Sequence, residues 1–355
     1  MIDFEVNYKA GTRLRVGESL YQVNDGHFMF KYLPSSALLY LPLSFFPLDV
    51  AKAFWYFAVI FCLVCIIYIS KKMITQKMEK TAYLFVLPPI ILAKFFLREL
   101  QLGQINAVIT MVLLLMIWFM AYGKTEKTSK NEIWMGLLWG LAVALKPYAL
   151  IFFPYFLLKK KGKALSSALG LWFLSFLATS LFYGFRGNII VFKDWISTLS
   201  QSTPRLLTSQ DNISIIALVM KWTGNQTLSV FLSGLVIALL AFLVFIVILK
   251  GKKIAQAPVL ECSILLLLTP LISPMGWDYT LIISVLGVMI IIRNFFQFSK
   301  FWRIILVSNF FIITFSLYDL MGREYYAMFM SWSVITINFL ILVGYLAYLR
   351  FKEIC

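Results

Sequence analysis

Apolar segments of roughly membrane-spanning length recur along almost the whole chain. A helix needs about 20 apolar residues to cross a bilayer, within a range of about 17–25. The segments that meet or approach this length are 51–69, 81–97, 104–121, 133–145, 148–158, 165–184, 226–249, 259–273, 278–292, 303–318 and 328–349. This pattern predicts an all-α polytopic membrane protein, a transmembrane helix bundle with about 11 spans and amphipathic loops at its outer face.

Composition supports the same class. Of the 355 residues, 61% are hydrophobic and 14% are charged, whereas soluble domains are about 45–50% apolar and about 25% charged. This excess of apolar residues excludes a soluble protein and a disordered one. Cys62 and Cys65 lie inside an apolar run and His27 is the only histidine, so neither zinc chemistry nor another metal site is expected.

The net charge of +16 is explained by topology. Cytoplasmic loops collect Lys and Arg, and the basic side chains here cluster in alternate loops. These are Lys71, Lys72, Lys77, Lys80, Lys124, Lys127, Lys130, Lys159, Lys160, Lys161, Lys163, Lys250, Lys252, Lys253, Arg293, Lys300, Arg303, Arg350 and Lys352. They share one side only if 133–145 and 148–158 are separate crossings rather than one broken helix. We therefore predict two crossings there, and no nucleic-acid partner.

The opposite face is predicted to hold most of the acids and the two longest polar segments, 1–50 and 185–225. Because functional residues concentrate in loops, we expect function on this extracytoplasmic side. The topology places 1–50 outside, although no span precedes Met1. We therefore expect one further helix upstream of this sequence, unless the protein does without it.

Asp3 is the first candidate for chemistry. A partly buried carboxylate gains basicity because desolvation disfavours its charged form, and such a group suits general-base catalysis. Most neighbouring residues of the N-terminal segment are equally consistent with an amphipathic stretch on the membrane surface.

Cations near the outer interface form a second candidate. Lys94, Arg98 and Gln101 follow i, i+4, i+7 spacing, so one helix face carries all three. Together, the two cations suit a phosphate, although snorkelling to the headgroups is the alternative. Gln104 and Asn106 either cap the next span or bond across helices.

Lys146 is a third candidate, because Pro147 breaks the helix and frees a carbonyl. Its ammonium can meet an anionic ligand, or it can bond that carbonyl in a purely structural role. Two further segments are weaker. Residues 211–215 suggest a helix N-cap, and 273–279 suggest a turn with an interfacial Trp277, where Asp278 caps the following helix.

Taken in order, these segments resemble the membrane glycosyltransferases of family 87, within the C-type (GT-C) superfamily, which includes polyprenol-phosphate-mannose-dependent α-mannosyltransferases. The resemblance rests on family patterns that occur here in the same order. They are D-x-x-V-Y-Y-x-A at 3–10, G-x-x-L-Y at 17–21, F-x-Y-P-P at 30–34, G-Q-x-N at 103–106, G-x-x-x-G-L-A-x-x-x-K-P at 136–147, N-Q-S-L at 212–215 and S-P-x-x-W-D at 273–278. Asn7 replaces an aromatic residue, Leu33 replaces a proline, and the histidine that often follows the last pattern is missing.

The resemblance implies one integral-membrane catalytic domain, 1–355, in the plasma membrane. It implies an inverting hexosyltransferase that moves a sugar, mannose by default, from a polyprenyl-phosphate donor to a hydroxyl of a glycolipid or glycan, without metal or other cofactor. Asp3 matches the catalytic base. Lys94, Arg98 and Lys146 are predicted to bind the donor phosphate, the first two from the charge pattern alone. The predicted substrate-binding residues are Tyr8, Tyr32, Gln104, Asn106, Asn212, Trp277 and Asp278.

Two other functions fit the hydrophobic pattern. A transporter or flippase of lipid-linked sugars often has internal repeats and polar residues at the membrane midplane. A structural or assembly protein explains the hydrophobicity but not the ordered segments. The sequence has no convincing repeat and its polar residues cluster toward one face, which favours an enzyme. Arabinose or another sugar, and a polymer or protein acceptor, remain open.

Overall fold

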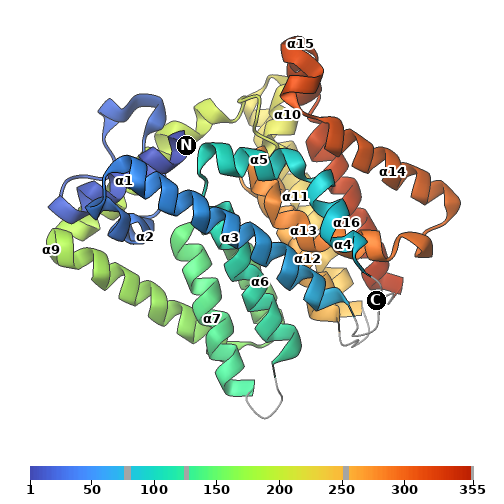
Figure 1. Cartoon of the computed structure of the whole chain (residues 1–355), viewed down its shortest axis with the longest axis horizontal. Helices are drawn as coiled ribbons and strands as arrows, with labels where there is room; N and C mark the ends of the chain where they lie inside the picture. Colours follow the sequence, from blue (N-terminus) through green and yellow to red (C-terminus); the bar gives the residue numbers. More distant parts are fainter. Residues whose placement is uncertain (76–80, 124–127, 251–255, 353–355) are drawn as a thin grey trace. The chain divides into compact units, whose positions relative to one another are not determined.

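A computed structural model describes residues 1–75, 81–123, 128–250 and 256–352 (Figure 1). Every regular element in these ranges is a helix, which confirms the all-α prediction. The chain forms two compact units. Unit 1 comprises Met1–Cys65 and Glu99–Pro204, and unit 2 comprises Ile66–Arg98 and Arg205–Cys355. Of the basic loop residues, Lys77, Lys80, Lys124, Lys127, Lys252 and Lys253 lie outside the described residues.

Unit 1 begins with α1 (Ile2–Val16), which packs against α2 (Ala37–Tyr40) and the 3-10 turn η3 (Pro42–Phe45). A β-carbon on Gly11 would lie 2.7 Å from Tyr40 O, so this contact needs a glycine. The remaining elements are η1 (Val23–Phe28), η2 (Pro34–Ser36), α3 (Leu48–Ile74), α6 (Asn106–Tyr122), α7 (Thr128–Leu145), η5 (Pro147–Phe152), α8 (Phe153–Leu158) and α9 (Gly162–Leu206). Helix α3 continues into unit 2.

Helix α7 ends at Leu145, and the chain then reverses direction. Trp139 Nε1 donates to Ala149 O at 2.8 Å, and the Trp139 ring packs 4.9 Å from that of Phe156. Lys161 Nζ lies 3.1 Å from Glu132 Oε1. The segments 133–145 and 148–158 are therefore separate and antiparallel, and the basic residues after α8 return to the first turns of α7. That each of the two segments crosses the membrane stays a prediction.

Helix α9 bends at Gly184, whose φ of 67° and ψ of 165° are not helical. Asn188 Nδ2 bonds back across the bend to Phe176 O at 2.9 Å. Beyond the bend, Trp195 Nε1 donates to Lys31 O at 3.2 Å, and this bond holds the second part of α9 to the N-terminal segment. The segment 185–225, expected as a loop, is therefore largely helical. Within unit 1, the part of α9 beyond the bend buries Asn188, Val191 and Thr198.

Unit 2 is built around α12 (Ala257–Ile272), α13 (Val285–Arg293) and α16 (Val334–Lys352), which pack against one another (Figure 1). Helices α12 and α13 are buried along almost their whole length, as expected for helices that are apolar on all sides. The other elements are α4 (Tyr83–Ile91), α5 (Ala93–Leu102), α10 (Ile215–Thr223), α11 (Gln226–Lys250), η6 (Asp278–Ser284), η7 (Phe295–Gln297), α14 (Lys300–Phe315) and α15 (Tyr318–Ser331). Helix α5 continues from unit 2 into unit 1 at Glu99.

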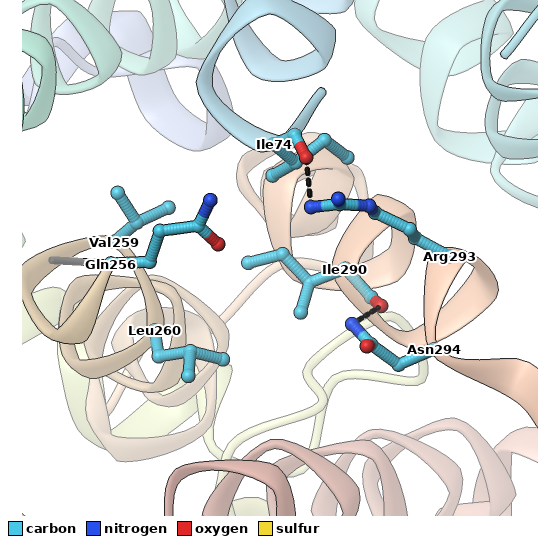
Figure 2. Close-up of a pocket in the computed structure, with 7 residues that line it drawn as sticks. All are labelled: Ile74, Gln256, Val259, Leu260, Ile290, Arg293 and Asn294. Atoms are coloured by element: carbon cyan, nitrogen blue, oxygen red, sulfur yellow. Dashed lines mark hydrogen bonds between the residues drawn. The ribbon is translucent and has the colours of Figure 1, made fainter. Parts of the chain in front are cut away.

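Several helix ends of unit 2 converge at a small hollow with an empty volume of about 210 Å³. Figure 2 shows the Arg293 guanidinium directed at Ile74 O, where it donates a hydrogen bond that caps the end of α3. Gln256, at the start of α12, lies across the hollow. Farther along α12, Arg350 Nη2 lies 2.8 Å from Glu261 Oε1. Basic residues of unit 2 thus gather at this end, and no predicted site residue lines the hollow.

Four helices among the described residues are long and apolar enough to cross a membrane. They are Leu48–Ile74, Gly162–Leu206, Gln226–Leu249 and Val334–Lys352. The pair Lys300–Phe315 and Tyr318–Ser331, bent by 105°, adds a fifth if it is one span. The predicted count of about 11 is therefore not confirmed. Several apolar segments are shorter helices, and 81–97 is divided between α4 and α5.

Candidate functional site

The turn between α5 and α6 organises the polar residues of unit 1. Gly103 ends α5 with a φ of 70°, a conformation that costs little only for glycine. A β-carbon there would lie 2.8 Å from Phe4 Cβ, and Trp55 Nε1 donates to Gly103 O at 2.9 Å. The glycine thus lets the turn pack directly on the first turn of α1. Gln104 and Asn106 follow at once and face the polar side chains described next.

Asp3 lies half-buried in the first turn of α1. Its Oδ2 accepts a hydrogen bond from Gln104 Nε2. The Oε1 of Gln104 in turn accepts from Tyr32 OH at 3.3 Å. The amide of Gln104 is therefore oriented by a donor on one side and a carboxylate on the other, so that its NH₂ faces Asp3.

Glu99 caps the start of α6. Its Oε1 accepts from the backbone N–H of Ala107 at 2.6 Å, and its Oε2 accepts from Asn106 Nδ2 at 2.9 Å. The side chain is completely buried. A carboxylate at a helix N-terminus is stabilised by the unpaired N–H groups and by the helix dipole. Burial raises the pKa of Glu99 to about 7, against these two donors and the charge of Lys146.

Lys146 lies at the break between α7 and η5, outside the candidate spans. Its Nζ donates to Asn106 Oδ1 at 2.8 Å, and it lies 5.0 Å from the centre of the Tyr32 ring. The Ala144 carbonyl near the break accepts from Ser35 Oγ instead. Burial lowers the pKa of Lys146 to about 8, while the charges of Glu99 and Asp3 oppose this shift. The ammonium therefore belongs to the same electrostatic cluster as Asp3.

The Tyr8 hydroxyl, by contrast, donates to Phe46 O at 2.8 Å. Tyr8 thereby fastens α1 to the turn that follows η3. In the structure the Tyr8 hydroxyl thus holds two segments of unit 1 together, and the predicted substrate-binding role of Tyr8 stays a prediction.

In unit 2, residues 211–215 and 273–279, the two segments whose sequence gave the weakest indication of function, are joined by backbone pairing. Asn212 and Trp277 form an isolated antiparallel bridge, Ile213 N donates to Gly276 O at 2.7 Å, and Asp278 N donates to Asp211 O at 3.2 Å. Asn212 Nδ2 also donates to Pro274 O at 2.9 Å. These bonds fix Asp211 and Asp278 beside each other.

Two cations of α5 face these two carboxylates. Arg98 Nη1 lies 3.0 Å from Asp278 Oδ2, and Arg98 Nη2 lies 2.9 Å from Asp211 Oδ2. Lys94 Nζ lies 3.1 Å from Asp278 Oδ2. Tyr326 OH donates to Asp211 Oδ1 at 3.4 Å. The cluster is charge-balanced, with two cations for two carboxylates.

The predicted site residues therefore divide between the two units. Unit 1 holds Asp3, Tyr8, Tyr32, Gln104, Asn106 and Lys146, and unit 2 holds Lys94, Arg98, Asn212, Trp277 and Asp278. The sequence patterns predicted no role for Glu99 or Tyr326, and Asp211 was predicted only as part of a helix N-cap. The sequence did hold one indication for Glu99. It directly follows Arg98 on the predicted cation face of α5, and charged residues at membrane depth need partners.

The all-helical architecture and the helices long enough to cross a membrane define a polytopic membrane protein, and its buried charges form clusters among the described residues. Residues 30–274 match the sequence profile of glycosyltransferase family 87. This match covers more than half of the chain, so the chain belongs to glycosyltransferase family 87 and is a membrane glycosyltransferase. The resemblance predicted from the ordered segments is thereby confirmed. Asp3, Tyr8, Trp277 and Asp278 lie outside the matched range. The chain matches no curated protein and no solved structure.

Proposed function

We propose that the protein is an inverting, metal-independent hexosyltransferase that uses a polyprenyl-phosphate sugar, mannose by default, and acts on the extracytoplasmic face of the plasma membrane. Its acceptor is a hydroxyl of a glycolipid or glycan. The observation that carries the proposal is one hydrogen-bonded cluster of unit 1 that holds a half-buried carboxylate, Asp3, and a buried ammonium, Lys146, joined through the amides of Gln104 and Asn106.

These two groups suit the two ends of a glycosyl transfer. Asp3 takes the proton of the acceptor hydroxyl as that oxygen forms a bond to C1 of the sugar. The bond from C1 to the phosphate oxygen breaks, and its electron pair remains on the polyprenyl phosphate. Lys146 stabilises that negative charge, which a preorganised cation can do in a site shielded from water. The proton ends on Asp3, and inversion follows from a single displacement.

The proposed sidedness rests on charge within each unit. In unit 1, Lys130 lies near the start of α7 and Lys146 just beyond its end, roughly 24 Å apart at 1.5 Å per residue. In unit 2, the hollow beside Gln256 and the Asp278 cluster lie at opposite ends of α12. Because basic residues mark the cytoplasmic side, the polar clusters belong to the outer face.

Lys94 and Arg98 retain their predicted phosphate-binding role only as a proposal, because both face Asp211 and Asp278. Lys146 is the better-supported phosphate ligand, since its direct partner is a neutral amide. Tyr32 and Asn106, which border the ammonium, are proposed to contact the substrate, and so are Asn212 and Trp277.

The test is a transfer assay on the purified protein with radiolabelled polyprenyl-phosphate mannose, matched arabinose and glucose donors, extracted membrane glycolipids and EDTA. General-base catalysis contributes about 10²–10⁴-fold, so Asp3→Asn should lose label transfer by that factor. Glu5→Gln is the matched control, because Glu5 lies in the same helix and only pairs with Lys52 at 2.7 Å. Near-normal turnover of Asp3→Asn would contradict the base assignment, and no transfer from any donor would favour a flippase.

A further inference from the structure

Glu99 is buried beside the proposed site, yet neither the proton transfer nor the phosphate contact uses it directly. As a carboxylate it is an acceptor on both oxygens. One oxygen takes the Ala107 N–H and the other takes the Asn106 amide. Both of these partners are donors, and a neutral isostere with one acceptor and one NH₂ group can satisfy only one of them.

This pairing leaves the Asn106 amide a single favourable orientation. An amide offers one oxygen and one NH₂ group. The NH₂ must face the acceptor-only carboxylate of Glu99, and so the oxygen faces the other way. There it accepts from the donor-only ammonium of Lys146 at 2.8 Å and from Tyr148 OH at 3.4 Å. A flipped amide would place NH₂ against the ammonium.

We infer that Glu99 is a positioning residue for the phosphate-binding ammonium: through the fixed amide of Asn106 it orients Lys146 and keeps its charge in place. This inference rests on the proposed function, in which Lys146 binds the leaving phosphate. Glu99 itself contacts neither substrate nor reacting atoms, and its effect passes entirely through Asn106 and the charge of Lys146.

The surroundings of Lys146 explain why its ammonium needs a permanent negative charge nearby. Its side chain is buried, and the rings of Tyr32 and Tyr148 lie 5.0 and 5.6 Å from Nζ. Burial disfavours an ammonium and lowers its pKa, and the two acids that oppose this shift are Glu99 and Asp3. Because Asp3 is the proposed base and becomes protonated during each turnover, Glu99 is the acid whose charge is not consumed by the reaction.

Binding of farnesyl phosphate, a short form of the leaving group, tests the inference without turnover. Its affinity is measured for the full chain in detergent between pH 7 and pH 10, with farnesol as the probe that lacks phosphate. Glu99→Gln should weaken farnesyl phosphate binding about tenfold, or about 1.4 kcal/mol, and leave farnesol binding unchanged. The pH at which binding is lost should also fall by about one unit, because a nearby negative charge favours the ammonium.

Two further variants separate positioning from simple damage. Glu132→Gln is the matched control, since Glu132 pairs with Lys161 elsewhere in unit 1, and it should bind farnesyl phosphate normally. The conservative variant Glu99→Asp keeps a carboxylate beside Asn106 and should retain most of the affinity. If Glu99→Gln fails to fold, Glu99→Asp alone must keep the affinity and the pH midpoint of the parent.

The outcomes are distinguishable. Unchanged affinity and an unchanged pH midpoint in Glu99→Gln, or a folded Glu99→Asp variant that binds as poorly as Glu99→Gln, would overturn the positioning role while the proposed function stands. If the parent protein binds farnesyl phosphate no better than farnesol, then the phosphate role of Lys146 fails, and the inference fails with it.

Discussion

Arg98 Nη1 lies 3.0 Å from Asp278 Oδ2, although 180 residues separate the two in sequence. The contact ties α5 to the first residue of η6. Asp278 is completely buried and its carboxylate also neutralises Lys94. A buried charge that loses its partner is costly. This carboxylate is the ion-pair partner of Lys94 and one of the two ion-pair partners of Arg98.

We predict that Asp278→Asn lowers the free energy of unfolding by about 3 kcal/mol or more, since breaking a buried ion pair leaves a buried charge without compensation. Asp211→Asn is the control within the same cluster. The Asp211 side chain is 30% exposed, so water can replace part of its interaction and the loss should be smaller. Thermal unfolding of both variants in detergent checks this order, and equal losses would contradict it.

The cation face of α5 could be predicted from the i, i+4 spacing of Lys94 and Arg98, because helical periodicity is local. Their partners could not, because Asp211 and Asp278 approach α5 only through the bridge between Asn212 and Trp277. Such pairing depends on tertiary packing that no local pattern encodes. For this reason Lys94 and Arg98, which the sequence suggested as phosphate ligands, face two carboxylates in the fold.

Gly276 gives a second prediction, on the same bridge. A β-carbon there would lie 1.9 Å from Pro270 O, so Gly276→Ala must displace the backbone pair that places Asp278. We expect a loss of about 1–3 kcal/mol in the free energy of unfolding. Gly344→Ala in α16 is the control, because nothing lies within 4 Å of its added methyl group. A similar melting temperature for both variants would refute the prediction.

The third prediction concerns Gln104, whose amide lies between Tyr32 and Asp3. If this amide orients the base, Gln104→Leu should lower kcat about tenfold while KM for the acceptor stays constant, because an interaction confined to the transition state is lost. If Gln104 instead binds substrate uniformly, KM rises and kcat is retained. Steady-state kinetics of label transfer distinguish the two roles, and Tyr183→Phe, which removes a hydroxyl bonded to Glu18 O elsewhere in unit 1, serves as control.

The span count shows a different limit of sequence analysis. Hydrophobicity correctly located α3, α11 and α16, which are long and uninterrupted. It could not show that 81–97 breaks at Leu92, between α4 and α5. Nor could it show that the polar segment after Gly184 continues as a helix. Apolar length measures the preference of a segment for lipid, whereas helix breaks depend on local packing and capping.

Arg13 and Asp25 give the last prediction, on pH dependence. The bidentate pair, with distances of 2.5 and 2.9 Å, ties α1 to η1 and holds the pKa of Asp25 below its ordinary value. A carboxyl with a depressed pKa in the folded state stabilises the fold above its unfolded pKa of about 3.9, and this stabilisation is lost as pH falls toward the lower folded value. Limited proteolysis of the 17–33 segment should therefore accelerate below about pH 4. Asp25→Asn should be cleaved faster already at pH 7 and lose this part of the pH dependence, whereas a variant that keeps the wild-type profile would show that the pair does not hold the segment.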